Sequence, residues 1–511
     1  MTESVAEGAY RGARAVHEGI LRRQSARESA ARTYARALPI VPVRARGLTI
    51  EGADGRRYLD CLSSAGTLAL GHNHPVVLEA IRKVLDSGAP LSVLDLATPV
   101  KDAFLTELFR TLPSGLAERA RVQFCGPAGT DAVEAALRLV RVATGRTGLL
   151  AFTSAYRGVT ADGARDAQVV RLPYPQAYRC PFGVDGPADA ERAARWAESL
   201  LDDPKSGVPL PAGLILEPVQ GEGGVIPAPD DWLRRMRRLT ADRSIPLVVD
   251  EIQTGVGRTG AFWAVDHSGI TPDVMVLSKA IGGSLPLAVM VYRDDLDIAP
   301  PGTQEGTFRG NQLAMAAGTA TLAYVREQGL AARAADLGSR MLSRLRGITE
   351  EFSCVGGVRG RGLMIGVELV QPEGLQGSEG LQEPGPEGPE AQAGRGGAQA
   401  APGEGACPGE PFLAASGRAL TRVPRPAAPE LAAAVQRECL ERGLIVELGG
   451  RHAGVIRLLP PLTISDEQAE AVLDRLTDAI AAVSRNAEDR RPRQDHALQR
   501  RRHHGPAVST G

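Results

Sequence analysis

One of the four lysines of this 511-residue chain follows directly on an apolar segment. Lys279 comes after the run at residues 274–278, and Asp250 ends another apolar run that begins at Leu247. Short apolar runs bounded by turn residues are typical of strands that are buried in a parallel sheet. Because ligands of open α/β sheets bind beyond the carboxyl ends of strands, we expect the amine and the carboxylate to meet at one site.

An amine and an acid placed in this way suit pyridoxal phosphate. The Lys279 amine can form a Schiff base with the aldehyde of this cofactor, and Asp250 can pair with its pyridinium nitrogen. The other lysines, at positions 83, 101 and 205, fall in helix or turn patterns. A lysine that ends an apolar strand is unusual, because an unpaired buried ammonium group is costly. The sequence therefore favours a chemical role for Lys279.

A phosphate-binding element is expected near Gly129. Backbone N–H groups at a helix N-terminus bind phosphate, and the run GPAGTD at 126–131 follows a strand that we expect at 121–124. We expect Thr130 to cap the helix that starts here and Gly145 to end it. An ordinary helix start after a turn would fit the same pattern, and only the Asp–Lys pair favours the phosphate.

Two other motifs favour structural interpretations. Residues 255–260 match GxGxxG, but no long helix pattern follows, so a dinucleotide site is not favoured. His72 and His74 have no third ligand at a spacing that suits a metal. A turn that leads into a helix at Pro75 explains the two histidines better.

An arginine and a glutamate on other segments are candidates for substrate binding. Glu217 ends a further predicted strand and leads into a glycine-rich loop that carries Glu222. Arg457 interrupts the apolar run 455–459, and a buried arginine must meet a carboxylate. A structural ion pair and the binding of a substrate would both satisfy this requirement.

The bulk composition is typical of a globular protein that acts on a small molecule. Hydrophobic residues make up 43% of the chain, and the net charge of −1 argues against nucleic acid or an anionic membrane as partner. Six scattered cysteines contain no CxxC pair, so neither a zinc site nor a disulfide framework is expected. The sequence has neither a signal peptide nor a stretch of about 20 apolar residues that could span a bilayer. We expect a cytoplasmic protein without a metal.

The predicted elements alternate in the manner of an α/β protein. From 76 to 325 strand-like and helix-like segments follow one another, which implies βαβ units and a mostly parallel sheet. Strands are expected at 121–124, 148–152, 213–217, 247–250, 274–278 and 287–292. Beyond residue 429 we expect a helix at 430–443, strands at 444–447 and 454–459, and a helix at 465–484.

Composition divides the chain further. Residues 372–428 are dominated by Gly, Pro, Glu, Gln and Ala without periodicity, which predicts a disordered insertion. The Arg-rich end at 485–511 is expected to be a solvated, disordered tail rather than a binding arm. The expected parts are an N-terminal segment with part of a small domain (1–75), a large cofactor-binding domain (76–325), and the C-terminal small domain (326–371 and 429–484).

Together these motifs resemble the class III aminotransferases, which are fold-type I pyridoxal-phosphate enzymes. The resemblance covers about residues 30–370 and 430–484. Its most specific part is 247–256, followed at the family's spacing by Lys279 and by GTFRGN at 306–311. The segments 23–34, 61–75 and 124–136 look like one branch of the family, the L-2,4-diaminobutyrate:2-oxoglutarate 4-aminotransferases.

The resemblance implies a large domain with a mostly parallel seven-stranded sheet and a small α+β domain built from both chain ends. It implies pyridoxal 5'-phosphate as cofactor, with Lys279 as the Schiff-base lysine that also moves the substrate proton and Asp250 as the partner of the pyridine nitrogen. It implies contacts of Gln253 with the 3' oxygen and of Tyr156 with the ring. The implied phosphate contacts are Gly129, Thr130 and, from the neighbouring subunit of a homodimer with shared active sites, Thr307.

The resemblance also implies a substrate switch. Arg457 would bind a carboxylate of 2-oxoglutarate, and Glu222 would pair with Arg457 when a diamine occupies the site. A movable pair lets one pocket accept a cation and then a dianion without leaving a buried charge unpaired. At Val159 the family often has an arginine that binds the distal carboxylate, so the second anchor stays open, with Arg157 as a candidate.

The implied reaction is a reversible ping-pong transamination between a small-molecule amino donor and a 2-oxo acid acceptor. The 4-amino group of L-2,4-diaminobutyrate would pass to the cofactor, which gives L-aspartate 4-semialdehyde, and 2-oxoglutarate would become L-glutamate. One alternative is another ω-amino acid aminotransferase, of the ornithine, acetylornithine or GABA type. A racemase or aminomutase of the same fold and a cofactor-free binding module are further alternatives.

Overall fold

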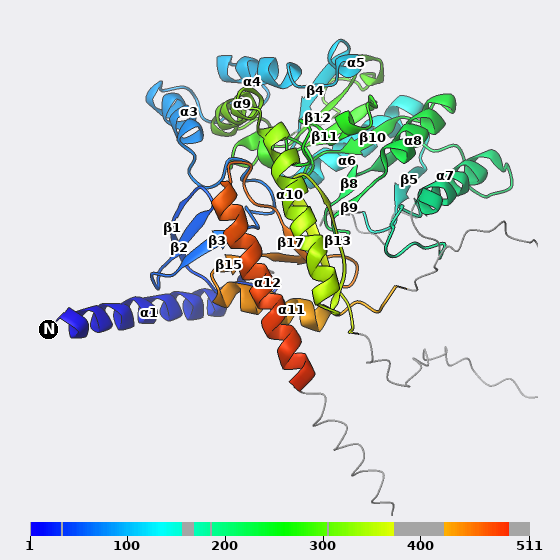
Figure 1. Ribbon diagram of the computed structural model, residues 1–511. Coiled ribbons are helices and arrows are strands. Elements are labelled where there is room, and N and C mark those ends of the chain that lie inside the picture. Colours follow the sequence, from blue (N-terminus) through cyan, green and yellow to red (C-terminus); the bar gives the residue numbers. More distant parts are fainter. Residues whose placement is uncertain are drawn as a thin grey trace, which may run out of the picture.

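A seven-stranded sheet forms the centre of the larger part of the molecule (Figure 1). The computed structural model describes residues 2–31, 34–155, 168–183, 187–303, 306–372 and 424–489. The strand order is β4-β12-β11-β10-β7-β5-β6, and the pairings are parallel except those of β12, which runs antiparallel to β11 and β4. The predicted mostly parallel sheet is therefore confirmed. Its strands are β4 (Ala120–Phe124), β5 (Leu149–Phe152), β6 (Val169–Leu172), β7 (Gly213–Leu216), β10 (Leu247–Asp250), β11 (Val274–Leu277) and β12 (Val289–Arg293).

Two features of this sheet were not predicted. The edge strand β6 is only partly buried over most of its length, so it lacks the continuous apolar run that marks the central strands. The antiparallel direction of β12 follows from its connection to β11, which contains the 3-10 turn η2 (Lys279–Gly282) and no crossover helix. A parallel neighbour would need a longer connection, usually a helix.

Alternate residues of the central strands face two different hydrophobic cores. Val248, Val274 and Val276 pack with α6 (Gly129–Thr144) on one face of the sheet. Met275 and Leu277 belong to the larger core on the other face, together with side chains of helices α4 (Pro99–Phe109), α8 (Asp230–Asp242) and α9 (Gln312–Glu327). Because helices cover both faces, these strands appear in the sequence as uninterrupted apolar runs.

A second part of the molecule combines segments from both ends of the chain. Its first sheet has the order β1-β2-β3-β15, in which β15 (Leu444–Ile445) pairs in parallel with β3 (Arg57–Asp60). Its second sheet has the order β13-β14-β17-β16. The single strand predicted at 444–447 is wrong, because the chain leaves the first sheet after Ile445 and enters the second one at Glu447. The other strands are β1 (Pro42–Arg46), β2 (Thr49–Gly52), β13 (Val355–Arg361), β14 (Met364–Leu369), β16 (Glu447–Gly449) and β17 (Val455–Leu458).

The insertion predicted at 372–428 leaves and rejoins the second part at adjacent points. Val370 and Ala427 form an isolated β-bridge, and residues 424–428 are described. The section at 373–423 lies outside the described residues. Helix α12 (Asp466–Asp489) continues past residue 484, and the rest of the predicted tail, 490–511, lies outside the described residues as well.

Helix α1 (Thr2–Arg27) projects from the body of the molecule, while α10 and α12 pack against each other along the second part (Figure 1). The predicted helix starts at Pro75 and near Gly129 and the end at Gly145, which has a left-handed φ of 66°, are confirmed. The remaining helices are α2 (Tyr34–Ala37), α3 (Pro75–Asp86), α4 (Pro99–Phe109), α5 (Ser114–Ala117), α7 (Pro187–Asp202), α8 (Asp230–Asp242), α9 (Gln312–Glu327), α10 (Leu330–Glu351) and α11 (Pro429–Glu441).

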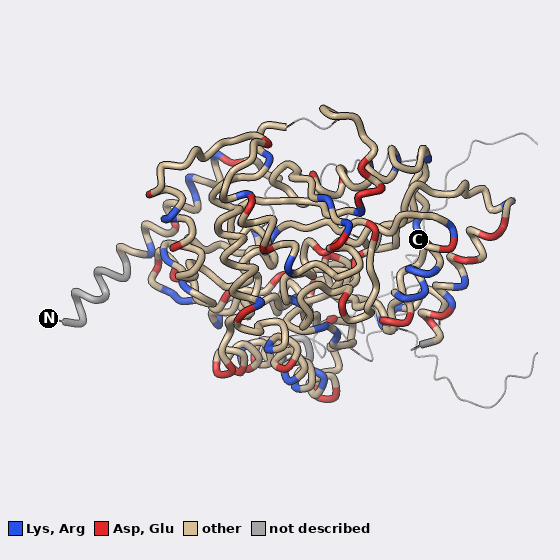
Figure 2. Tube along the Cα trace, turned by 90° about the horizontal axis from the view of Figure 1, so that it is seen from above, with Lys and Arg blue, Asp and Glu red and all other residues tan. Residues whose placement is uncertain are grey.

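Acidic and basic residues are interspersed over the described chain (Figure 2). Several of them pair between neighbouring helices, as Arg344 of α10 does with Glu470 and Asp474 of α12. In the part of the chain that the structure describes, no helix is long and apolar enough to cross a membrane.

Helix α9 approaches the backbone of the turn η2 so closely that Gly318 must lack a side chain. A Cβ atom at Gly318 would collide with the carbonyl oxygen of Ile281. We expect Gly318→Ala to lower the free energy of unfolding by about 1–3 kcal/mol, because overpacking forces the backbone to shift. The matched control is Gly347→Ala on α10, where nothing lies within 4 Å of the new methyl group. Denaturant unfolding measures both, and equal stability of the two variants would contradict the prediction.

Candidate active site

Asp250 ends strand β10, and Lys279 comes shortly after the end of the neighbouring strand β11, at the same edge of the central sheet. The strands β10 and β11 are parallel, with Asp250 opposite Val276, so their carboxyl ends lie side by side. Lys279 has a left-handed φ of 52°, a conformation that is uncommon for residues other than glycine. Within the described chain, no hydrogen bond or ion pair occupies the Lys279 amine.

Burial changes the protonation of both groups. It lowers the pKa of Lys279 below the ordinary 10.5, and the charges of Glu222 and Asp250 act against this shift. Burial raises the pKa of Asp250 to about 6, opposed by the N–H of Ile252, which donates to Oδ1 at 2.9 Å, and by Lys279. A lowered pKa provides the free amine that attacks a carbonyl carbon. The buried acid, in turn, is best matched by a cation.

The start of helix α6 lies beside Asp250. A Cβ atom at Gly129 would lie 2.9 Å from Cδ1 of Ile252, so the glycine permits a close approach of the helix to the turn after β10. The helix begins at Gly129, with Ala128 as its N-cap, and the predicted cap at Thr130 is wrong. Asp131 accepts the N–H of Ala128 at 3.0 Å. The N–H groups of a first helical turn have no partner inside the helix, which suits a phosphate.

Gln253 presents a buried oxygen that has no partner. Its Nε2 donates to the carbonyl oxygen of Ala65 at 3.1 Å, but its Oε1 is buried and accepts no hydrogen bond in the described chain. A Cβ atom at Gly221 would collide with this oxygen, so Gln253 packs against the loop that carries Glu222. Because buried polar atoms are nearly always hydrogen-bonded, this oxygen marks a place that a bound group can complete.

A buried arginine with two acidic neighbours faces the lysine. Arg457 on β17 is 0% exposed, and its Nη2 lies 2.9 Å from Glu222 Oε1 and 2.6 Å from Glu447 Oε2. Glu447 stands directly opposite Arg457 in the antiparallel pair of β16 and β17. The hydroxyl of Tyr34 donates to the other Glu447 oxygen at 3.0 Å. We call Tyr34, Glu222, Glu447 and Arg457 the acidic cluster.

The charges of this cluster act on Lys279. Those of Glu222 and Glu447 raise its pKa and that of Arg457 lowers it. Burial raises the pKa of Glu447, and Arg457 opposes that shift. Burial and the Glu447 charge raise the pKa of Tyr34, so its hydroxyl stays protonated as the donor. The arrangement therefore places an amine, an arginine and several carboxylates around one space.

Glu447 and Tyr34 are not among the site residues predicted from the sequence. Glu447 does carry a signal, because it follows the apolar residues 444–446 as Asp250 follows its own apolar run. It also lies ten positions before Arg457, and the Gly-Gly pair at 449–450 separates the two residues. This spacing fits a hairpin. Tyr34 is 413 positions away from Glu447, and no pattern in the sequence connects the two.

Of the remaining predicted site residues, one is exposed in a loop and the others are not described. Tyr156 lies outside the described residues, together with Arg157 and Val159. Thr307 is exposed in the loop before α9, and within the described chain no hydrogen bond or ion pair joins it to the other predicted residues.

The histidines at 72 and 74 and the GxGxxG match at 255–260 have the structural roles that were expected. His72 bonds to Asp60 at 2.8 Å, whereas the ring of His74 lies edge-on to Tyr324 with centroids 4.8 Å apart. The two histidines therefore have separate partners. Residues 255–260 form turns, and no α-helix follows them before β11.

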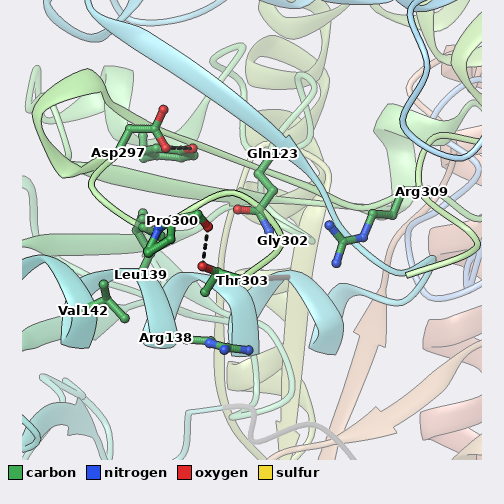
Figure 3. Close-up of a pocket in the computed structure, with 11 residues that line it drawn as sticks. Gln123, Arg138, Leu139, Val142, Asp297, Pro300, Gly302, Thr303 and Arg309 are labelled. Carbon is green, nitrogen blue, oxygen red and sulfur yellow. Dashed lines mark hydrogen bonds between the residues drawn. The ribbon is translucent and has the colours of Figure 1, made fainter. Parts of the chain in front are cut away.

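Another hollow of the molecule lies between α6, the strands β4 and β12, the segment at 297–303, and Arg309 (Figure 3). Its lining includes Arg138 and Arg309 but no lysine. Thr303 closes one side through a hydrogen bond to the carbonyl oxygen of Pro300. Neither Lys279 nor Asp250 lines this hollow, so the expected chemistry belongs to the Lys279 site.

Comparisons with known proteins agree with this fold and site. The family model for aminotransferase class III matches residues 30–480, and the chain belongs to this family. It is 48% identical to the diaminobutyrate--2-oxoglutarate aminotransferase of Rhizobium meliloti over 93% of this chain and 95% of that protein. It is 39% identical to the enzyme of the same name from Haemophilus influenzae, over 91% and 96%.

A solved structure shares the fold. The PLP-bound amine transaminase from an uncultivated Pseudomonas species is 28% identical, with a TM-score of 0.71 over 89% of this chain and 97% of that chain. The resemblance to the class III aminotransferases is confirmed.

Proposed function

We propose that this protein is a pyridoxal 5'-phosphate-dependent aminotransferase that acts on the 4-amino group of L-2,4-diaminobutyrate, with 2-oxoglutarate as acceptor. The products are L-aspartate 4-semialdehyde and L-glutamate, and the reaction is reversible. The observation that carries the proposal is the buried Lys279–Asp250 pair at neighbouring strand ends, facing the acidic cluster. The names of the 48% and 39% identical relatives support the substrate pair.

The residues of the site fit this cofactor. Asp250 would hold a proton on the ring nitrogen. The side-chain amide of Gln253 would contact the edge of the ring, where its unpaired Oε1 would find a partner. The first turn of α6, at Gly129 and Thr130, would bind the phosphate. When bound, the cofactor supplies an electron sink for the substrate carbon. Lys279 would carry the substrate proton.

The proposed reaction also uses two residues that no described contact links to Lys279. Tyr156 would cover the ring from the segment after β5. Thr307, exposed in its loop, would reach the phosphate at the active site of a second subunit, so that the enzyme works as a homodimer.

The Arg457–Glu222 ion pair would separate the two half-reactions. Glu222 belongs to the hairpin of β8 (Val219–Gln220) and β9 (Ile226–Pro227), and its side chain is 39% exposed. It can therefore turn into solvent, whereas Arg457 is buried and stays. With Glu222 in place the arginine is neutralised for an amine donor; with Glu222 turned away, Arg457 binds a carboxylate of the acceptor.

The test is a half-reaction. We expect the yellow absorbance of the holoenzyme to be lost when L-2,4-diaminobutyrate is added without acceptor, and to return with 2-oxoglutarate. Loss of the absorbance with ornithine or 4-aminobutyrate but not with diaminobutyrate would overturn the substrate. A protein that takes up no cofactor from added pyridoxal phosphate would overturn the whole proposal.

A further inference from the structure

Arg457 has one more acidic neighbour than a switch requires. Glu222 is enough to neutralise the arginine, yet Glu447 lies even closer, with Oε2 2.6 Å from Nη2 compared with 2.9 Å for Glu222. The contact with Glu447 lacks hydrogen-bond geometry, so the buried Oε2 accepts no hydrogen bond in the described chain. The cluster thus contains a carboxylate oxygen that is desolvated but not fully satisfied.

Glu447 is the fixed member of the two acids. It belongs to β16, pairs with Arg457 across the ladder, and has a side chain that is only 9% exposed. Tyr34 holds its other oxygen from outside the sheet, and Gln436 donates to the carbonyl oxygen of the preceding Val446 at 3.0 Å. When Glu222 moves into solvent, Glu447 therefore remains in the pocket.

With both glutamates ionised, the cluster carries one more negative than positive charge, and the charge of Glu447 is the one that stays buried. Arg457 contributes one positive charge, whereas Glu222 and Glu447 contribute two negative charges when both are ionised. Buried charges are stable only when they are paired. In the described chain Lys279 makes no ion pair with either glutamate. A cationic group on the amino donor would supply the missing positive charge.

We propose that Glu447, positioned by Tyr34, recognises the second ammonium group of a diamino acid and thereby makes the enzyme select diamino donors. This inference rests on the proposed function. In L-2,4-diaminobutyrate the 4-amino group reacts and the 2-ammonium group remains charged. 4-Aminobutyrate is the same molecule without that second ammonium group, so the two donors differ only in the group that Glu447 would bind.

The experiment compares these two donors in the holoenzyme. We expect Glu447→Gln to lower the ratio of kcat/KM for diaminobutyrate over 4-aminobutyrate by about 10–100-fold, mainly through KM, since hydrogen bonds to charged groups have that range of strength. Tyr34→Phe, at a position that is 49% exposed and tolerant of the change, should shift the ratio in the same direction by less.

A matched control and a binding measurement separate recognition from structure. Glu107 on α4 is a buried glutamate between Arg110 and Arg326, outside the cluster, and Glu107→Gln should leave the donor ratio unchanged. Titration of the holoenzyme without acceptor should show that Glu447→Gln raises the concentration of diaminobutyrate, but not of 4-aminobutyrate, that is needed for half of the loss of the cofactor absorbance.

Two outcomes would overturn the inference, and they differ from failure of the function. Equal losses for both donors would show that Glu447 has only a structural role, and an unchanged ratio in both variants would show that it does not contact the donor. A wild-type enzyme that prefers 4-aminobutyrate would instead refute the proposed substrate, and the inference with it.

Discussion

The Lys279→Ala variant is expected to lose transamination by on the order of 10⁴-fold or more, because it removes both the attacking amine and the group that moves the substrate proton. No other lysine can substitute: Lys83 is exposed beside Glu79, and Lys101 bonds to the carbonyl oxygen of Asp95. Lys205 lies in the exposed turn that follows α7. The measurement is the steady-state rate with diaminobutyrate and 2-oxoglutarate.

The matched control is Lys83→Ala, which removes a surface lysine and should keep full activity. Borohydride treatment of the wild-type holoenzyme should attach the cofactor permanently to the peptide that contains Lys279, and the Lys279→Ala variant should show no such adduct. Unfolding of the variant should occur near the wild-type midpoint, because the side chain has no partner to lose in the described chain. Activity within tenfold of wild type would refute the role of Lys279.

The Asp250→Asn variant should lose about 10²–10³-fold in turnover, which is typical when one preorganised charged group is removed from an active site. An asparagine is neutral and cannot hold a proton on the ring nitrogen, so the substrate carbon would lose the stabilisation that the positive ring gives. Cofactor content, measured by absorbance, should remain substantial. A turnover equal to wild type would contradict the prediction.

For the Asp250→Asn variant we also expect a pH-dependent difference in the stability of the cofactor-free protein. The pKa of Asp250 is about 6 in the folded state against an ordinary 3.8, so between these values the folded state keeps a proton that the unfolded state has lost. The free energy of unfolding therefore falls as the pH rises from about 4 to about 6, and above that range the full cost of the buried Asp250 charge is present. Asparagine avoids it, so Asp250→Asn should exceed wild type in stability by up to about 3 kcal/mol at pH 8 and by almost nothing at pH 4. Asp231→Asn, at a side chain that is 93% exposed, is the control.

Much of the central sheet could be predicted because its signals are local. The runs that became β10 and β11 are apolar because both of their faces are covered. Asp250 ends the first run, and Lys279 follows the second after Ser278. The edge strand β6 lacks such a run and was missed. The break between β15 and β16 was also missed. Residues 444–447 form one uninterrupted run of apolar residues that ends in an acid, and this run looks the same in the sequence whether it joins one sheet or two.

The sequence by itself determined the amine and acid at Lys279 and Asp250, a helix start close to Gly129, and the family to which the chain belongs, because each depends on residues that are close together in the chain. Only the tertiary structure showed that Glu447 is a second partner of Arg457, beside the expected Glu222. Tyr34 lies 413 positions before Glu447, and their contact exists because the two ends of the chain fold into one part of the molecule. The burial that lowers the pKa of Lys279 and raises that of Asp250 is likewise a property of the whole fold, since it depends on every element that removes water from the site.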